Sequence, residues 1–393
     1  MKYFLCLFIF LPAYFLSEAQ YNVVFKLDRY PLQHSNDTIF LAGSFNAWDP
    51  RNIAYKIFPA GENTFSLQLP AGEYEYKCTR GNWKKVESLN NGKDIENHFI
   101  KINRDTTIEI NIEAWKDDFV AVPKEHTASD QVQILDTAFF IPQLNRTRRI
   151  WIYLPEGYAK SKKKYPVMYM QDGQNLFDAN TSGFGEWGAD ECLDSLIAKG
   201  KPACIIIGID NGVTTRMSEY NPYEFILESS TYTSQKYLPE GKEYVNFLVE
   251  TLKPFIDKKY RTLPSKENTI IAGSSMGGLI SYYAMLQQPN IFGKAGIFSP
   301  AFWTAPPVRS LTDSLAGKVS GKFFFYMGGM EGGTYIEDMK EVQEVLGEKS
   351  SAMIYSVIDS ESNHNEQAWR KWFAEFYNWI MADGYNTVIK VKD

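Results

Sequence analysis

One stretch constrains this chain more than any other: residues 269–283, TIIAGSSMGGLISYY. Its apolar start predicts a buried strand, and the small and apolar residues that follow predict a helix. A Gly-x-Ser-x-Gly pattern centred on Ser275 joins them, which is the spacing of a tight strand-to-helix turn without room for neighbouring Cβ atoms. Such a turn exposes the Ser275 hydroxyl and leaves the N–H of Met276 at a helix N-terminus, facing a developing oxyanion. We interpret Ser275 as a nucleophile, because the rival hydroxyl of Ser274 lacks the flanking glycines.

An acid and a base follow predicted strands further along the chain. Glu331 follows one such strand, and His364, the only histidine after Ser275, follows the last. The order serine, acid, histidine is that of an α/β-hydrolase, in which the imidazole takes the serine proton and a carboxylate orients the ring. We therefore expect Glu331 and His364 to complete a triad, with Asp338 and Asp359 as alternative acids.

The second donor of an oxyanion hole comes from the loop after an early strand. Residues 170–178, MQDGQNLFD, are the candidate loop. Gly173 permits a tight turn there. We expect the N–H groups of Gln174 and Met276 to form the hole; the alternative is an ordinary glycine turn.

Strand and helix patterns alternate over residues 132–393, which predicts a mostly parallel sheet with helices on both faces, as in an α/β-hydrolase fold. Expected strands are 148–154, 166–171, 203–209, 268–273, 294–299, 322–327 and 352–358. Expected helices are 186–198, 244–260 with an interruption at Pro254, 336–346 and 366–382.

Residues 20–117 instead show short alternating segments separated by Gly and Asn clusters, which predicts a small all-β sandwich. Expected strands are 21–27, 38–43, 64–69, 73–79, 97–102 and 106–112. The charged residues 118–131, which include Pro123, are expected to link the two domains.

Residues 1–19 have the character of a cleavable signal peptide. Lys2 precedes an apolar run that is too short for a membrane span, and a small-x-small site ends at Ala19. We expect cleavage there, a periplasmic or secreted location, and no membrane span afterwards.

The composition excludes several other classes. The formal net charge of −6 gives no electrostatic basis for nucleic-acid binding. The expected cleavage removes Cys6 and leaves Cys78, Cys192 and Cys204, which are far apart and odd in number, so we expect buried thiols, with one disulfide as the alternative. The histidines show no metal-ligand spacing, so no metal or other cofactor is expected. No oligomeric state is predicted.

Part of the first domain resembles a known module. The resemblance rests on LAGSFNAWDP at 41–50, PAGEYEYK at 70–77, and Asn82-Trp83. These segments are similar to the early-set, immunoglobulin-like modules called glycogen-binding or carbohydrate-binding family 48 domains. The resemblance implies a sugar platform of Trp48, Lys77 and Trp83, because aromatic faces stack on pyranose rings. Residues 80–87 depart from the acidic turn of the glucan binders, so the alternative is a structural module that acts as a spacer or a wall of the site.

The second domain resembles the Putative esterase family, which includes esterase D, the enterochelin (ferric siderophore) esterases and carbohydrate esterase family 1. The motifs are MQDGQNLF at 170–177, EWG at 186–188, GIDNG at 208–212, Arg216 with Glu219-Tyr220, AGSSMGG at 272–278, FSPAFW at 298–303, GGME at 328–331, and HNE at 364–366 with Trp369. The resemblance implies a substrate site lined by Asp172, Gly173, Trp187, Arg216 and Trp303. The tryptophans as core residues, and an Arg216–Glu219 helical ion pair, are the alternatives.

These observations together predict a secreted serine carboxylic-ester hydrolase that works through an acyl-enzyme without a cofactor. Its partner would be a small-molecule or polysaccharide ester, with an acetyl or feruloyl group on a glycan as the first expectation. The alternatives are a ferric siderophore trilactone esterase, for which the single cation Arg216 is a weak fit, and an inactive glycan-binding protein on a hydrolase scaffold.

Overall fold

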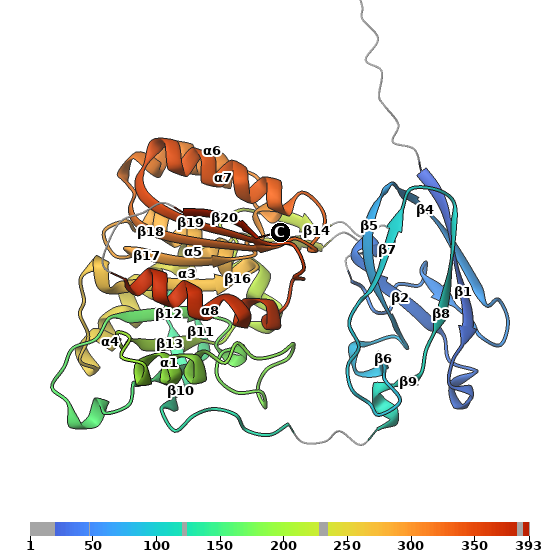
Figure 1. The fold of residues 1–393 in the computed structure, drawn as a ribbon, viewed down its shortest axis with the longest axis horizontal. Helices are drawn as coiled ribbons and strands as arrows, with labels where there is room; N and C mark the ends of the chain where they lie inside the picture. The colour runs from blue at the N-terminus through green and yellow to red at the C-terminus, as the bar shows by residue number, and fades with distance from the viewer. Residues whose placement is uncertain (1–19, 47, 120–123, 228–234, 383–387, 393) are drawn as a thin grey trace, which may run out of the picture. The chain divides into compact units, whose positions relative to one another are not determined.

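The structure is a computed structural model, and it describes residues 20–46, 48–119, 124–227, 235–382 and 388–392 (Figure 1). The described residues form two compact units, one on either side of residues 120–123. The predicted signal peptide at 1–19 and residues 120–123 of the predicted linker lie outside the described residues. None of the helices in the described ranges has the length and apolar character that crossing a bilayer requires.

The first unit is the predicted all-β sandwich. One sheet has the order β4 (Thr64–Pro70), β1 (Gln20–Arg29), β8 (Thr106–Asn111). The other has the order β3 (Lys56–Ile57), β2 (Ile39–Gly43), β5 (Gly72–Thr79), β7 (His98–Ile102), and a ribbon pairs β6 (Glu87–Ser88) with β9 (Ala114–Trp115).

Alternate residues of these strands fill one core. Val23, Phe25 and Leu27 point inward from β1, and Tyr76 and Cys78 point inward from β5. This period of two is the pattern that predicted the strands, and all six predicted strands are present. The three additional strands are only two residues long, which is too short to show a pattern.

The second unit is built on a nine-stranded sheet with the order β10-β11-β13-β12-β16-β17-β18-β19-β20. The strands are β10 (Val132–Ile141), β11 (Arg146–Tyr153), β12 (Val167–Gln171), β13 (Ile205–Ile209), β16 (Thr269–Ser274), β17 (Lys294–Phe298), β18 (Ser320–Gly328), β19 (Ser351–Asp359) and β20 (Val388–Lys392). All pairs are parallel except β10–β11 and β11–β13. The predicted mostly parallel α/β sheet is therefore confirmed.

Helices cover both faces of this sheet (Figure 1). Helices α1 (Ala189–Ala198) and α8 (Glu366–Met381) pack on one face, and α3 (Gly241–Phe247), α4 (Lys253–Lys259), α5 (Met276–Gln287), α6 (Val308–Leu315) and α7 (Tyr335–Lys349) pack on the other. Successive strand residues serve opposite cores, as Ile270 and Ile271 do on β16. The short helix α2 (Arg216–Glu219) and the hairpin β14 (Phe225–Leu227), β15 (Gln235–Tyr237) lie outside these layers.

The structure differs from the sequence-based expectation in several places: strands β10 and β20, the hairpin β14–β15 and helix α6 were not predicted. The predicted helix 244–260 is present, but a π-helical turn at Leu248–Leu252 joins α3 to α4 just before Pro254. Strand β10 was not predicted, because it is an edge strand whose residues are mostly exposed or half-buried and lack a clean alternation. The thiols of Cys78, Cys192 and Cys204 are free.

Close packing of α8 on the sheet yields a prediction at Gly296 in β17. A Cβ added there would lie 2.7 Å from the ring of Phe376, whereas a Cβ at Gly347 in α7 would meet only Ile354, at 3.7 Å. We expect Gly296→Ala to lower the free energy of unfolding by about 1–3 kcal/mol through overpacking. The control Gly347→Ala should raise it by roughly 0.5–1 kcal/mol, because Ala is the better helix former. Calorimetric melting of both variants checks this; equal midpoints would contradict it.

Candidate active site

Ser275 occupies a strained turn between β16 and α5. Its φ of 58° and ψ of −124° lie in a region that residues with a Cβ rarely adopt. Three backbone hydrogen bonds hold it: its N–H donates to Phe298 O (2.9 Å), and its carbonyl accepts from the N–H groups of Leu279 (3.0 Å) and Ala301 (3.1 Å). A Cβ at Gly273 would lie 2.8 Å from backbone atoms of Gly277, which explains why glycines flank Ser275. The predicted elbow geometry is therefore present at Ser275.

The start of α5 supplies the first predicted oxyanion donor. Met276 is the first residue of α5, so helix geometry gives its N–H no partner within the helix. The N–H groups of a helix N-terminus attract negative charge. The Met276 N–H is therefore placed beside Ser275 as an oxyanion hole requires.

Glu331 and His364 form a hydrogen-bonded pair beyond the ends of β18 and β19. His364 Nδ1 lies 2.6 Å from Glu331 Oε2, and the Glu331 side chain is 1% exposed. The other carboxylate oxygen, Oε1, accepts from Gly328 N (2.7 Å) and from the Ser299 hydroxyl (2.5 Å). Both oxygens of the carboxylate are therefore committed, and the pair directs the opposite nitrogen, Nε2, away from Glu331.

Trp369 braces the same pair from α8. Its indole N–H donates to the Ser299 hydroxyl (2.9 Å), and its ring meets that of His364 edge-on at 5.2 Å. The imidazole is thus fixed by a hydrogen bond on one side and by an aromatic ring on another.

The alternative acids have other partners. Asp359 accepts from Trp372 Nε1 (2.7 Å), Ser362 Oγ (2.8 Å) and Lys371 Nζ (2.6 Å). Burial alone would raise the pKa of Asp359, but these donors outweigh it and lower the pKa to about 2. Asp338 accepts from the Thr334 hydroxyl at the start of α7 (2.9 Å). Of these three acids, Glu331 is the one bonded to His364 in the described part of the chain.

The loop after β12 lies beside the elbow. Asp172 adopts a φ of 55°, and a 3-10 turn follows at Gly173–Asn175. A Cβ at Gly173 would lie 2.7 Å from Ile209 N, and one at Gly277 would lie 3.2 Å from Asp172 Oδ2. These close approaches bring the predicted oxyanion loop, which contains Gln174, against the first turn of α5.

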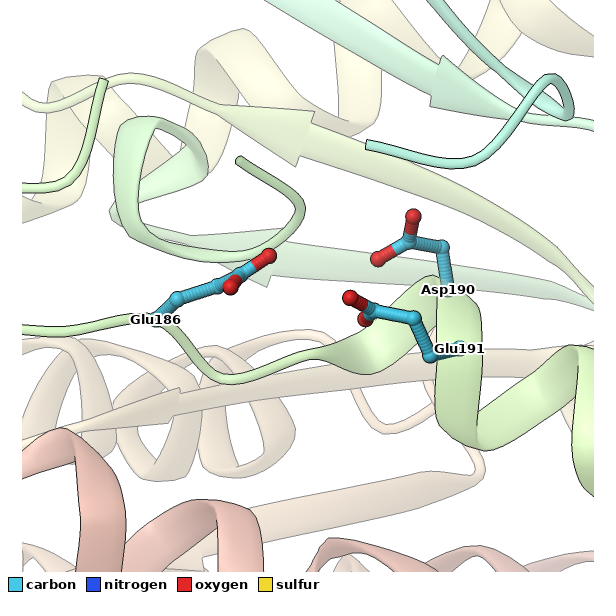
Figure 2. A group of neighbouring side chains, drawn as sticks. All are labelled: Glu186, Asp190 and Glu191. Atoms are coloured by element: carbon cyan, nitrogen blue, oxygen red, sulfur yellow. The ribbon is translucent and has the colours of Figure 1, made fainter. Parts of the chain in front are cut away.

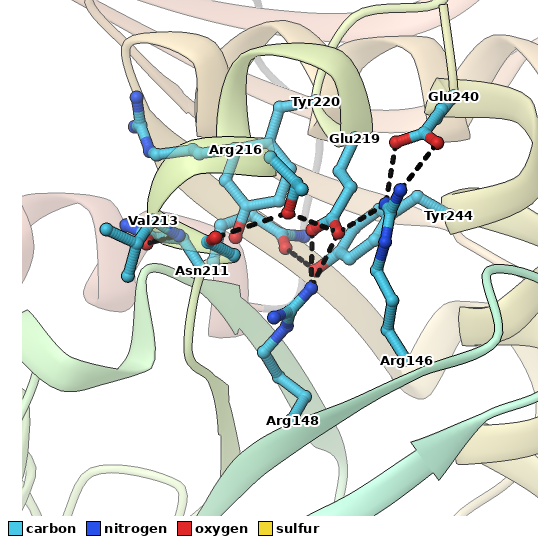
Figure 3. Close-up of polar contacts among 12 residues, drawn as sticks. Arg146, Arg148, Asn211, Val213, Arg216, Glu219, Tyr220, Glu240 and Tyr244 are labelled. Atoms are coloured by element: carbon cyan, nitrogen blue, oxygen red, sulfur yellow. Dashed lines mark hydrogen bonds and ion pairs between the residues drawn. The ribbon is translucent and has the colours of Figure 1, made fainter.

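Arg216 pairs with Asp172, not with Glu219. Its Nε and Nη2 each donate to a carboxylate oxygen of Asp172 at 2.8 Å, and Asn211 Nδ2 donates to the same carboxylate at 2.7 Å. Glu219 is fully buried and instead accepts from Arg146 and Arg148 (Figure 3). Because Asp172 balances its charge, Arg216 presents no uncompensated cation to a substrate.

Glu366 and Asn175 lie in two quoted sequence motifs, but neither residue was predicted to have a role of its own. Asn175 Nδ2 donates to Glu366 Oε1 (3.0 Å), and this bond ties the oxyanion loop to the first residue of α8. Burial and the charge of Asp172 raise the pKa of Glu366 to about 7, against the opposing charges of His364 and Arg216. The only sequence signal for Glu366 was its position within the HNE motif that begins at His364.

The two tryptophans implied to line the site differ in exposure. Trp187 is 2% exposed, and its ring packs against those of Phe298 and Trp369. It is therefore a core residue that supports Trp369. This corrects its expected role as a substrate contact. Trp303 is 41% exposed and stacks on Tyr335, with ring centroids 6.0 Å apart. Trp303 thus offers an aromatic surface five residues after the end of β17.

The implied sugar platform of the first unit is partly assembled. The rings of Trp48 and Trp83 lie 6.3 Å apart at an angle of 41°, and Trp83 is 42% exposed. The ammonium group of Lys77 donates to the carbonyl of Ile95 and is partly buried. The paired rings therefore form an accessible aromatic surface, whereas Lys77 is held within the module.

Comparison with known proteins places the second unit. The model of the family described as "Putative esterase" matches residues 141–379. The chain belongs to this esterase family. Among curated relatives, an uncharacterized protein of Bacillus subtilis, YbbA, is 25% identical over 251 residues, which are 61% of this chain and 95% of the relative. An endo-1,4-beta-xylanase/feruloyl esterase of Xylanibacter ruminicola is 30% identical over 194 residues, 48% of this chain but only 24% of that protein.

A solved structure has a similar fold across both units. The enterobactin esterase FES of Shigella flexneri, solved with enterobactin, aligns over 88% of each chain with 15% identity and a TM-score of 0.53. Family membership supports an ester hydrolase.

The Glu331–His364 pair yields a pH prediction. Burial alone would lower the pKa of His364, but the charge and hydrogen bond of Glu331 outweigh it and raise this pKa above the ordinary 6.5. The pair therefore stabilises the fold fully below pH 6.5 and loses this contribution as pH rises through the higher folded-state pKa. Glu331→Gln should bring the pKa below that of the native protein, as NMR titration of the imidazole can measure. Asp338→Asn is the control and should leave it unchanged; an unchanged pKa in Glu331→Gln would contradict the pairing.

Proposed function

We propose that this protein is a secreted serine carboxylic-ester hydrolase that acts through an acyl-enzyme on acetyl or feruloyl esters of polysaccharide. The observation that carries the proposal is the 2.6 Å hydrogen bond between His364 and the buried carboxylate of Glu331, at the same end of the parallel sheet as the strained turn at Ser275. Family membership supports the reaction class. The signal-peptide character of residues 1–19 supports secretion.

In the proposed mechanism, Ser275 Oγ attacks the ester carbonyl carbon while His364 Nε2 takes its proton. Glu331 holds Nδ1 and stabilises the imidazolium. The N–H groups of Met276 and Gln174 stabilise the oxyanion of the tetrahedral intermediate. The proton then passes from His364 to the leaving alcohol, and the C–O bond breaks to give an acyl-enzyme. Water, deprotonated by the same imidazole, releases the acid and restores the serine.

Two observations support a glycan ester as substrate. The exposed rings of Trp83 and Trp303, and the half-buried ring of Trp48 beside Trp83, offer aromatic faces that can stack on sugars or on an aromatic acyl group. The pairing of Arg216 with Asp172 leaves that cation neutralised, which suits an uncharged ester better than an anionic ferric catecholate.

The proposed nucleophile has a neighbouring control. We expect Ser275→Ala to reduce kcat on a chromogenic acetyl ester by about 10⁴-fold or more, because the covalent route is lost. Ser274→Ala should keep kcat within about 3-fold, since Ser274 ends β16 and lies outside the elbow centre. Steady-state kinetics and labelling by a fluorophosphonate probe measure both. Full activity or full labelling in Ser275→Ala would refute the mechanism.

A panel of substrates tests the acyl and alcohol groups. We expect kcat/KM for a feruloylated or acetylated xylo-oligosaccharide to exceed that for a ferric trilactone by at least roughly 10-fold, because Asp172 already neutralises Arg216, the cation expected to bind the catecholate. Release of ferulate, acetate or the linear trimer can be followed by chromatography. Faster trilactone cleavage would replace this substrate class with a siderophore. Binding to xylan with neither hydrolysis nor probe labelling would instead indicate a glycan-binding protein.

A further inference from the structure

Three acidic side chains converge at the start of α1, away from the histidine and serine of the proposed site. Glu186 lies two residues before α1, and Asp190 and Glu191 lie in its first turn (Figure 2). One carboxylate oxygen from each lies within 4.8 Å of the others. Acids are common in the first turn of a helix, because the helix dipole favours them. Their convergence alone therefore does not indicate a ligand.

The partners of these oxygens provide the second observation. Asp190 is 0% exposed, and its Oδ2 accepts from Ser129 N at 2.7 Å. Its other oxygen, Oδ1, is buried, points toward the other two carboxylates (Figure 2), and has no hydrogen-bond partner in the described part of the chain. Glu191 Oε2 is buried and unpartnered in the same way. Buried anionic oxygens are normally paired with a donor or a cation, so these two indicate a missing positive group.

The protein cations nearby do not supply it. Arg370 Nη1 lies 3.5 Å from Glu186 Oε2, and among the described residues no ion pair reaches the oxygens of Asp190 or Glu191. The cluster therefore carries an excess of negative charge when its carboxylates are ionised.

We propose that Glu186, Asp190 and Glu191 bind a Ca²⁺ ion. Oxygens that share one Ca²⁺ at 2.3–2.6 Å lie no more than about 5 Å apart, which the cluster satisfies. Mg²⁺ gives up its water ligands reluctantly and is usually bound through one or two carboxylates, so a set of three carboxylates favours the larger ion. The set contains oxygen ligands alone, which disfavours zinc and copper. Water would complete the six to eight ligands that Ca²⁺ takes.

The ion would join three pieces of chain. Ser129 and Thr127, from the segment expected to be a linker, already bond to Asp190 and to Glu186 respectively. Adjacent to Glu186, the N–H of Trp187 donates to the carbonyl of Asn175 in the oxyanion loop (2.9 Å). A bound Ca²⁺ would therefore stabilise the second unit and its oxyanion loop without contact with the reacting ester. His and Cys spacings gave no signal of this proposed site, because its ligands are acidic residues.

A shared proton between Asp190 and Glu191 is the competing explanation, and it predicts the opposite response to one variant. Asp190→Asn supplies an N–H donor of the same shape, which would satisfy Glu191 without an ion. It also removes one charged Ca²⁺ ligand. The isosteric change therefore separates the two explanations.

Chelator-treated protein, titrated with CaCl₂ by calorimetry at pH 8, tests the proposal. We expect one site per chain and a melting temperature that rises with Ca²⁺ concentration, because the ion binds only the folded state. Asp190→Asn should weaken Ca²⁺ binding by at least about 10-fold. Glu348→Gln, an exposed acid on α7, is the matched control and should bind as the native protein does.

Absence of Ca²⁺ binding to the native protein would overturn the proposal, as would equal affinity in Asp190→Asn. If Asp190→Asn does not fold, Glu191→Gln takes its place with the same expected loss. These readouts are metal binding and melting temperature, so they remain informative whichever ester the protein hydrolyses.

Discussion

The strained backbone at Ser275 is the constraint on which the rest of the second unit depends. A residue held in such a conformation costs of order 1–3 kcal/mol, so it persists only where the surroundings fix it. Here the turn is fixed from both sides, because its N–H bonds to β17 through Phe298 and its carbonyl accepts from Leu279 and Ala301. The strand before it is fully buried, which leaves the turn no alternative path. The core of the sheet thus supplies the free energy that keeps the hydroxyl exposed.

The same logic extends to the buried charges around the elbow. Removing one member of a buried ion pair is strongly destabilising, since the other is left uncompensated. Asp172 is held by Arg216 and Asn211, and Glu219 by Arg146 and Arg148. These contacts join α2 and the loop after β13 to the oxyanion loop and to β11. Because breaking any of these buried ion pairs is costly, the segments that they join are held rigidly. Preorganised oxyanion donors require such rigidity.

Sequence patterns predicted what sterics and periodicity determine, and missed what depends on partners far along the chain. The elbow was predictable because only glycine tolerates the close backbone approach beside Ser275. The pairing of Arg216 was not, because the spacing of three to Glu219 mimics a helical ion pair while Asp172 lies 44 positions away. Trp187 carried a family motif, yet its ring lies in the core. Local sequence patterns indicate which residues lie near a turn. Which of their side chains contact one another depends on the complete fold.

The segment between β12 and α1 connects the turn at Ser275 with the acidic cluster at the start of α1. It begins at Asp172 and Gly173, against the elbow, and it ends at Glu186, where the carboxylates converge. Between them, Asn175 bonds both to Glu366 beside the imidazole and to the backbone of Trp187. A segment tied at both ends and in the middle has few ways to relax independently. The position of Gln174, the proposed oxyanion donor on this segment, is therefore set jointly by the sheet, by the loop that carries His364, and by the contacts of the acidic cluster at its far end.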